Sequence, residues 1–308
     1  MDTAALLSYL NLFLPKENIR TEEPMSSHTS FRVGGPAGIF LTVPGEEELG
    51  RIFAYLHENE LPYFILGNGS NLLVSDSGFD GVVVSLGEGF EGIEVSENEI
   101  KAGAAALLGR VSRVAQEAGL AGLEFASGIP GSLGGGVVMN AGAYGGELSQ
   151  VICRVRAMDK QGRVFTLRKD QLELGYRTSI FKKQPYIILD VTMELKQGNA
   201  EDILLQMKEY NRLRQEKQPL EYPSAGSTFK RPEGYFAGKL IMDAGLKGYS
   251  VGGAQVSEKH CGFVINKNKA TAEDIHRLME EIQERVKQQF GVWLEPEVIF
   301  LGEKEERA

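Results

Sequence analysis

The apolar positions along the chain follow two spacings, and each spacing predicts one kind of element. Apolar residues three and four positions apart predict helices at 4–14, 46–59, 107–118 and 201–214, a helical stretch near 235–245, and a long helix between Thr271 and Gly291. Short apolar runs, several of them with a period of two, predict strands at 31–33, 39–43, 63–66, 72–75, 82–86, 92–95, 100–102, 151–158, 163–168, 186–195, 250–256, 261–265 and 292–301.

Capping residues sharpen several of these helix boundaries. Thr271 and Asp274 have the spacing of a capping box, and Gly119 and Gly291 follow the last apolar position of their helices. By contrast, Asn18–Thr21 and Pro24–Ser30 have the composition of loops. Because strands and helices do not alternate regularly, the pattern indicates an α+β fold rather than a doubly wound sheet.

Composition and charge narrow the function classes. The chain has 308 residues and a net charge of −9, which argues against a general nucleic-acid binder or a protein that binds anionic membranes. Cys153 and Cys261 are far apart and carry no metal-ligand spacing, so we expect buried thiols and no metal site. The N-terminal apolar stretch lacks a basic start and a cleavage site, and no stretch reaches membrane-spanning length, so we expect a cytoplasmic protein.

The stretch from Gly122 to Glu147 is unusually rich in glycine, with nine glycines in 26 residues. Apolar residues lie between the glycines, which argues against a flexible linker. Glycine lets the backbone approach a ligand closely, so we favour ordered backbone laid against a large, flat, partly phosphorylated cofactor. The alternative is a set of tight turns between short strands.

A second glycine-containing loop, LGNGSN at Leu66–Asn71, follows a predicted strand. A dinucleotide fingerprint of the Rossmann type needs a third glycine and a following helix, and this loop has neither. Closely spaced amides in such a turn can still bind an anion, and a pyrophosphate is a plausible ligand. The alternative is a simple hairpin turn.

Several ordered motifs together resemble one known family. FRVGG, LGNGSNLL, GIPGSLGGGVVMNAGAYGGE, GYRTSIF, SAGSTFKRP, AGLKGYSVGGAQVSEKHCGFVIN and LEPEVIF occur in the order found in UDP-N-acetylenolpyruvoylglucosamine reductases, the MurB family. The resemblance extends from about residue 24 to residue 301. It is to the shorter form of the family, which lacks a tyrosine-bearing loop over the substrate.

The resemblance implies a specific architecture. It implies an FAD-binding, PCMH-type two-subdomain α+β fold followed by a C-terminal α+β substrate domain. The expected boundaries are 1–72 for the first FAD-binding subdomain, with a return strand at 293–308, then 73–218 for the second subdomain and 219–292 for the substrate domain. The polar, proline-marked segment Arg214–Pro223 is the best candidate for a boundary within the chain.

The resemblance also implies an activity and three catalytic residues. The family reduces an enolpyruvyl ether of UDP-N-acetylglucosamine to UDP-N-acetylmuramate, with NADPH as co-substrate and FAD as the bound relay. Arg177 would hold the carboxylate and the developing enolate, Ser227 would protonate C2, and Glu297 would act as an acid or orient the site. Glu295, two residues away, is the alternative to Glu297.

The expected ligand contacts fall into two groups. Non-covalent FAD is expected at Gly67, Asn68, Gly69, Ser70, Asn71, Gly128, Ile129, Pro130, Gly131, Ser132, Gly134, Asn140 and Gly142. The UDP-sugar is expected at Tyr144, Lys230, Tyr249, Gln255 and His260, although each of these could equally belong to a solvated face. His28 precedes FRVGG, and some related flavin domains attach FAD through histidine, but we expect no covalent bond here.

Two other functions stay open on the sequence alone. One is a flavin oxidase of the same cofactor-domain class that acts on a sugar or hydroxy acid, and the other is a non-catalytic protein that binds a nucleotide sugar. For the reductase we expect a monomer whose partners are the UDP-sugar and NADPH, with no nucleic acid and no membrane insertion.

Overall fold

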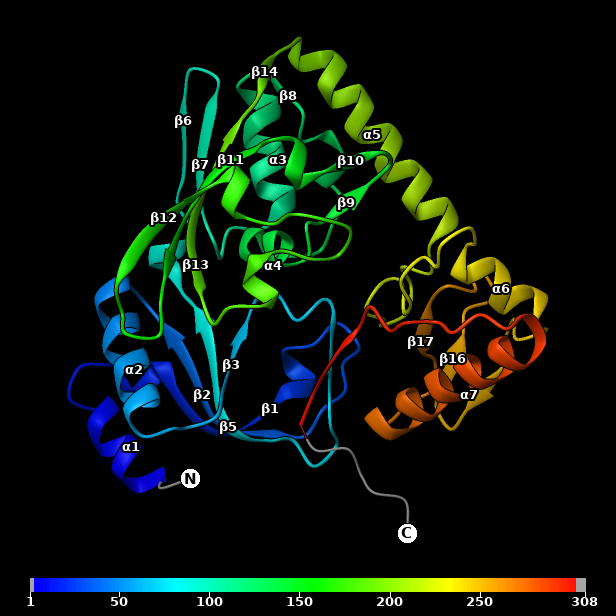
Figure 1. Cartoon of the computed structure of the whole chain (residues 1–308), viewed down its shortest axis with the longest axis horizontal. Helices are drawn as coiled ribbons and strands as arrows, with labels where there is room; N and C mark the ends of the chain where they lie inside the picture. Colours follow the sequence, from blue (N-terminus) through cyan, green and yellow to red (C-terminus); the bar gives the residue numbers. More distant parts are fainter. Residues whose placement is uncertain (1–2, 303–308) are drawn as a thin grey trace. The chain divides into compact units, whose positions relative to one another are not determined.

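The computed structural model describes residues 3–302, which form a mixed set of helices and strands (Figure 1). The helices are α1 (Thr3–Leu10), α2 (Glu46–Glu58), α3 (Leu108–Glu117), α4 (Leu133–Val138), α5 (Ala200–Lys217), α6 (Ala237–Asp243) and α7 (Ala272–Phe290). The first strands are β1 (Ile19–Pro24), β2 (Pro36–Val43), β3 (Tyr63–Leu66), β4 (Leu72–Val74), β5 (Phe79–Leu86), β6 (Ile93–Ser96) and β7 (Glu99–Gly103). The remaining strands are β8 (Leu120–Ala121), β9 (Gly142–Ala143), β10 (Gly146–Glu147), β11 (Ile152–Met158), β12 (Val164–Arg168), β13 (Ile187–Glu194), β14 (Lys196–Gln197), β15 (Ser250–Val251), β16 (Ala254–Val256), β17 (Val264–Asn266) and β18 (Ile299–Leu301).

The α+β fold predicted from the sequence is confirmed, and the chain divides into two compact units. Unit 1 comprises Ile39–Asn68, Gly81–Arg214 and the N-terminal residues up to Thr21, and unit 2 comprises Glu22–Gly38, Gly69–Asp80 and the residues from Gln215 onward. The three-part division that the sequence predicts stays a prediction. Residues 303–308 of its return strand, and residues 1 and 2, lie outside the described residues.

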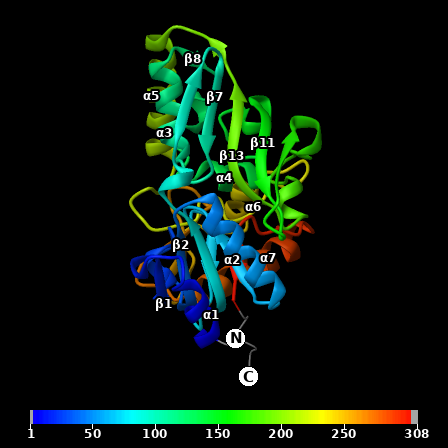
Figure 2. The same ribbon diagram turned by 90° about the vertical axis from the view of Figure 1, so that its left-hand side faces the viewer.

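Unit 1 contains two hydrophobic cores, each built on one sheet. The four-stranded sheet has the order β1-β2-β5-β3, and α2 buries Leu49, Ile52, Phe53 and Leu56 in the core beside it. The five-stranded sheet has the order β12-β11-β13-β7-β6, and all its pairings are antiparallel. Helices α3 and α4 cover one face of this second sheet (Figures 1 and 2). The predicted apolar stripes of α2 and α3 are therefore buried as expected.

Unit 2 has a separate core between α6, α7 and a small sheet, β15-β16-β17. The capping box predicted for α7 is confirmed, because Thr271 Oγ1 accepts the Asp274 amide at 3.0 Å and Asp274 Oδ2 accepts the Thr271 amide at 3.1 Å. Gly291 ends the helix with a φ of 71°. Strand β18 pairs in parallel with β4, which joins residues 299–301 to the strand that follows the LGNGSN loop.

Four of the predicted elements were wrong. Phe31 and Val33 are buried on either side of exposed Arg32, which imitates a strand, but Arg32 has a φ of 57° and the segment is a loop. Ile19–Thr21 and Pro24, predicted as parts of two loops, lie in strand β1 at the edge of a sheet. The predicted strand 250–256 is a hairpin that turns at Gly252, with a φ of 52°. Of the predicted strand 292–301, only Ile299–Leu301 is a strand.

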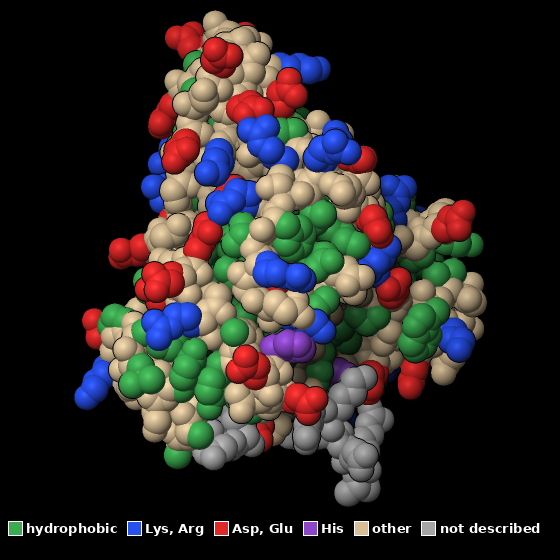
Figure 3. Space-filling model, turned by 60° about the vertical axis from the view of Figure 1, so that its left-hand side comes forward, with side chains coloured by type: hydrophobic (Ala, Val, Ile, Leu, Met, Phe, Trp, Pro, Cys, Tyr) green, Lys and Arg blue, Asp and Glu red, His purple; other side chains and the backbone are tan. Residues whose placement is uncertain are grey.

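Two observations concern membrane spanning and the distribution of surface charge. Among residues 3–302, none of the helices combines the length and the apolar character that crossing a bilayer requires. On the face drawn in Figure 3, lysines and arginines are interspersed with aspartates and glutamates.

Candidate active site

The glycine-rich stretch is ordered and forms short elements of unit 1. It contains a 3₁₀ turn at Glu124–Ala126, the six-residue helix α4 and the β9–β10 hairpin. Ser132 caps α4, because its Oγ accepts the Gly135 amide at 3.3 Å. The sequence did not predict this helix, since three successive glycines disfavour one.

Many of these glycines are required by the packing of the protein itself. A Cβ at Gly146 would lie 2.5 Å from the Phe125 ring, and one at Gly136 would lie 3.0 Å from Leu108. A Cβ at Gly142 would lie 2.7 Å from the Gly146 carbonyl oxygen. Part of the glycine content thus serves tight internal turns, the alternative that the sequence left open.

The two glycine loops nevertheless lie against each other. A Cβ at Gly67 would come within 2.7 Å of Ser132 Oγ, and the Asn68 side chain donates to the Pro130 carbonyl oxygen at 2.7 Å. Among residues 3–302, no hydrogen bond uses the backbone amide of Asn68, Gly131 or Ser132 as its donor. Backbone amides without a partner in the protein are available to phosphate oxygens, and binding of the FAD pyrophosphate by these amides stays a prediction.

The predicted cofactor positions of unit 1 differ in their exposure. Gly131, Ser132, Gly134 and Asn140 are buried, Gly128, Ile129 and Gly142 are half-buried, and Gly67, Asn68 and Pro130 are exposed. Their direct contact with FAD stays a prediction.

The second half of the LGNGSN loop belongs to unit 2. Gly69 has a φ of 59°, and a Cβ there would lie 1.8 Å from the His28 carbonyl oxygen, so this position needs glycine. Ser70 is half-buried, and Asn71 donates from its side chain to the Glu297 carbonyl oxygen at 2.9 Å. His28 itself pairs with Glu23 through Nε2 at 2.8 Å.

Arg177 lies in a strained turn of unit 1. Gly175 and Thr178 exchange two backbone hydrogen bonds of 3.1 and 3.2 Å, and Arg177, the third residue of this turn, has a φ of 54°. That position of a turn favours glycine, because a left-handed backbone crowds the Cβ of any other residue. A half-buried arginine held there is the kind of backbone outlier that clusters at functional sites.

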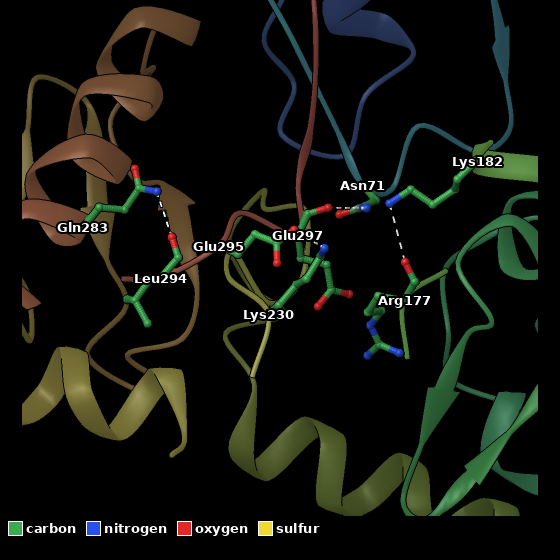
Figure 4. A network of polar contacts seen from close by, with 8 residues as sticks. All are labelled: Asn71, Arg177, Lys182, Lys230, Gln283, Leu294, Glu295 and Glu297. Atoms are coloured by element: carbon green, nitrogen blue, oxygen red, sulfur yellow. Dashed lines mark hydrogen bonds and ion pairs between the residues drawn. The ribbon is translucent and has the colours of Figure 1, made fainter. Parts of the chain in front are cut away.

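Neighbouring side chains fix the Arg177 turn in place. Buried Asn140 donates to the Gly175 carbonyl oxygen at 3.1 Å and accepts the Ser149 amide at 2.8 Å. Buried Ser179 donates to the Val138 carbonyl oxygen at 2.8 Å, and Lys182 donates to the Arg177 carbonyl oxygen at 3.5 Å (Figure 4). Asn140, predicted as a cofactor contact, therefore also positions the arginine turn.

Ser227 is exposed and follows a glycine with a φ of 77°. Its neighbour Thr228 is buried and anchors the segment: Thr228 donates its amide to Gly262 at 2.9 Å and accepts the Val264 amide on Oγ1 at 2.9 Å. The serine hydroxyl is thus presented from a rigid backbone at the surface of unit 2.

Glu297 lies on a segment that pairs with residues 228–229, directly after Ser227. An antiparallel bridge joins Phe229 to Pro296, and the Glu297 amide donates to the Thr228 carbonyl oxygen at 2.9 Å. Glu297 is half-buried, whereas Glu295 is exposed and forms an ion pair with Lys230 (Figure 4). The structure therefore brings Ser227 and Glu297 onto adjoining segments of unit 2 and gives Glu295 a different partner. Arg177 belongs to unit 1, and its joining the other two at one site stays a prediction.

The predicted substrate residues differ in how far the protein itself engages them. Lys230 is occupied by Glu295, and the Tyr249 hydroxyl is bonded to Glu281 at 2.5 Å and to Arg285 at 2.7 Å. The Gln255 side chain donates to the Gly248 carbonyl oxygen and to Ser250 Oγ, both at 3.1 Å. These three contacts give the residues structural roles, and binding of the UDP-sugar by them stays a prediction.

His260 is half-buried, whereas Tyr144 is exposed. His260 Nδ1 accepts the Gly262 amide at 3.1 Å, so Nε2 carries the proton of the neutral ring, and burial lowers the His260 pKa. Tyr144 has a φ of 53° in the β9–β10 turn, is 38% exposed, and stacks on Tyr210 at 4.7 Å. Burial raises the Tyr144 pKa, which the charge of Arg214 partly offsets.

The sequence analysis missed Arg214 as a candidate binding residue. It lies near the C-terminal end of α5, and a Cβ at Gly128 would approach its Cδ at 3.2 Å. Burial lowers the pKa of the Arg214 guanidinium, the expected effect on a cation removed from water. Within the sequence it was one of several basic residues on a helix, and only the fold places it beside the glycine-rich stretch.

Comparison with known proteins decides the family. The UDP-N-acetylenolpyruvoylglucosamine reductase of Lachnoclostridium phytofermentans is 50% identical over 303 residues, covering 97% of this chain and 98% of the relative. The chain belongs to the UDP-N-acetylenolpyruvoylglucosamine reductase (MurB) family. The reductase of Clostridioides difficile is also 50% identical, over 297 residues that cover 96% of this chain and 98% of the relative.

Family models and a solved structure agree with this membership. Residues 37–168 match an FAD binding domain, and residues 218–301 match the UDP-N-acetylenolpyruvoylglucosamine reductase C-terminal domain. The crystal structure of MurB from Thermus caldophilus superposes with a TM-score of 0.80 at 37% identity, covering 92% of this chain and all of that chain. Every predicted cofactor position lies within the FAD-binding match, and Ser227 and Glu297 lie within the C-terminal match.

Proposed function

We propose that this protein reduces UDP-N-acetylglucosamine enolpyruvate to UDP-N-acetylmuramate, with FAD as bound cofactor and NADPH as hydride source, in the synthesis of peptidoglycan precursors. The observation that carries the proposal is the 50% identity, over nearly the full length of both chains, to proteins named for this reductase activity. The structure supports it with a loop pair whose backbone amides are available to a pyrophosphate and with an arginine held in a strained turn.

The reaction adds a hydride to C3 and a proton to C2 of the enolpyruvyl group. FAD, when bound, supplies the redox step by taking the hydride of NADPH and passing it on. Negative charge then develops on the substrate carboxylate and C2, and fixed positive charge stabilises it. Arg177 has the planar, permanently charged fork for this role, and its turn holds it without further rearrangement.

The proton then comes from unit 2. Ser227 donates it to C2, and because a serine hydroxyl is a weak acid, a neighbouring group must restore the proton. Glu297, on the segment paired with that of Ser227, is the carboxyl group suited to this relay. We further propose that a monomer carries out this reaction in the cytoplasm.

Spectroscopy of the purified protein tests the proposal. The protein should be yellow, its flavin absorption should be bleached by NADPH without oxygen, and it should return on addition of the enolpyruvyl nucleotide. A protein that stays colourless after reconstitution with FAD would count against the proposal. Rapid recolouring by oxygen alone, with no response to the nucleotide, would favour a flavin oxidase.

A further inference from the structure

The segment that carries Glu297 is not part of a regular sheet. Strand β18 begins only at Ile299, and Pro296 has no amide hydrogen to give to a ladder. The backbone around Glu297 therefore depends on individual hydrogen bonds, and each one can be assigned to a specific partner.

These bonds hold the segment from two directions. On one side the Lys230 amide donates to the Glu295 carbonyl oxygen at 2.8 Å, and the Thr228 carbonyl oxygen accepts the Glu297 amide at 2.9 Å. Two side chains complete the set: Gln283 donates to the Leu294 carbonyl oxygen at 2.8 Å, and Asn71 donates to the Glu297 carbonyl oxygen at 2.9 Å (Figure 4).

Asn71 makes the contact closest to the catalytic candidate. A carbonyl oxygen only accepts, so the side-chain amide nitrogen of Asn71 must be the group that faces Glu297. The Asn71 carbonyl oxygen also accepts the Ile299 amide at 3.0 Å. Two bonds that flank Val298 fix both the position and the rotation of the peptide from which the Glu297 side chain extends.

We propose that Asn71 is a positioning residue for Glu297, rather than a direct contact of the cofactor. Through it, the second half of the LGNGSN loop, Gly69–Asn71, and the carboxyl-bearing segment form one piece of unit 2. The proposal rests on the proposed function for its catalytic meaning. The two hydrogen bonds that join Asn71 to Glu297 and Ile299, called the clamp below, can be measured without that function. Misplacing a catalytic group by about 1 Å costs roughly a hundredfold in rate, so the loss of one hydrogen bond at this place should slow the reaction strongly.

The test compares the two half-reactions of the FAD-loaded protein with the side chain changed by Asn71→Leu. This substitution keeps the approximate size of the side chain and adds no charge, but it removes the donor. We expect reoxidation by the enolpyruvyl nucleotide to slow about tenfold to a hundredfold. Flavin reduction by NADPH and the dissociation constant of FAD should stay within about threefold, because neither uses Glu297.

Amide hydrogen exchange supplies a readout that needs no substrate. Asn71→Leu removes the bond on the Glu297 carbonyl oxygen and leaves the Glu297 amide bonded to Thr228. Because the less constrained segment opens more often, exchange of the Glu297 amide should accelerate about threefold to tenfold. Unchanged exchange at Glu297 would overturn the clamp, whatever the activity. If Asn71→Leu does not fold, Asn71→Ala gives the same comparison.

Gln283→Met is the matched control, because it removes the side-chain hydrogen bond to the backbone carbonyl of Leu294, three residues before Glu297. We expect it to slow reoxidation by less than about threefold. An equal slowing in both variants would mean that the segment needs only general rigidity, and would overturn the specific role of Asn71.

Weaker FAD binding or slower flavin reduction in Asn71→Leu would instead assign Asn71 to the cofactor. If the wild-type protein does not turn over the nucleotide, the proposed function fails, while the exchange measurement still decides the clamp.

Discussion

Arg177 in unit 1 and Glu297 in unit 2 are fixed by opposite means. Arg177 occupies a backbone conformation that favours glycine, and buried Asn140 and Ser179 hold the chain on either side of it. Glu297 has no left-handed φ and lies between the bridge at Pro296 and strand β18, where hydrogen bonds to its own amide and carbonyl hold it. A left-handed turn stores free energy at the candidate residue Arg177, whereas Glu297 is not left-handed and lacks this strain. The two regions should therefore respond differently to substitution.

Ser227→Ala should have the largest effect on turnover. It removes the proposed proton donor from the segment beside Glu297, so reoxidation by the enolpyruvyl nucleotide should slow by about 10²–10⁴-fold. Flavin reduction by NADPH should be unchanged, because it precedes proton transfer. Stopped-flow absorbance of the two half-reactions measures both, and unimpaired turnover would refute the assignment of Ser227.

Arg177→Gly should separate activity from stability. Turnover should fall about 10²–10³-fold, because the developing negative charge loses its cation. The free energy of unfolding should nevertheless exceed that of Arg177→Ala by about 1 kcal/mol, since glycine relieves the left-handed strain that alanine keeps. Urea denaturation and steady-state kinetics of both variants provide the comparison. If the alanine variant is the more stable of the two, the turn is not strained.

A pair of substitutions on one segment tests the choice between two carboxylates. Glu297→Gln should slow reoxidation about a hundredfold, because it removes the ionisable group beside Ser227. Glu295→Gln should change it by less than about threefold, since it loses only an exposed ion pair with Lys230. The reverse order of effects would transfer the catalytic role to Glu295.

The smallest expected effect comes from the loop pair in unit 1. In Gly67→Ala the new Cβ would meet Ser132 Oγ at 2.7 Å, so Ser132 must rotate and lose its cap on α4. We expect a loss of about 1 kcal/mol in stability and a roughly tenfold weaker binding of FAD. Gly92→Ala is the control, because a Cβ there meets nothing within 4 Å. Equal FAD binding by Gly67→Ala and the wild-type protein would argue against a cofactor at this loop pair.

Local signals in the sequence were sufficient where neighbouring residues along the chain determine the structure. The α7 helix begins at its capping box and ends at Gly291 as predicted, and α2 buries the four predicted apolar residues. These features depend on contacts three or four residues apart, so the sequence contains all the information needed.

The same signals failed where the burial pattern of the side chains does not match the conformation of the backbone. Phe31 and Val33 are buried with the period of a strand, yet Arg32 takes a left-handed conformation and the segment is a loop. Residues 19–24 carry few apolar side chains, and pairing at a sheet edge makes them a strand. Hydrophobic period reports which side chains are buried and does not report the hydrogen bonds of the backbone.

The sequence by itself determined the fold class, the family and the residue types needed for the chemistry, because ordered motifs and local periodicity are written along the chain. The tertiary structure alone decided that Glu295 pairs with Lys230, that Glu297 adjoins the Ser227 segment, and that Asn71 bonds to Glu297 rather than only lining a loop. These are contacts between residues 65 to 226 positions apart. Such contacts depend on how complete segments pack. No local pattern in the sequence determines which of the two carboxylates pairs with Lys230.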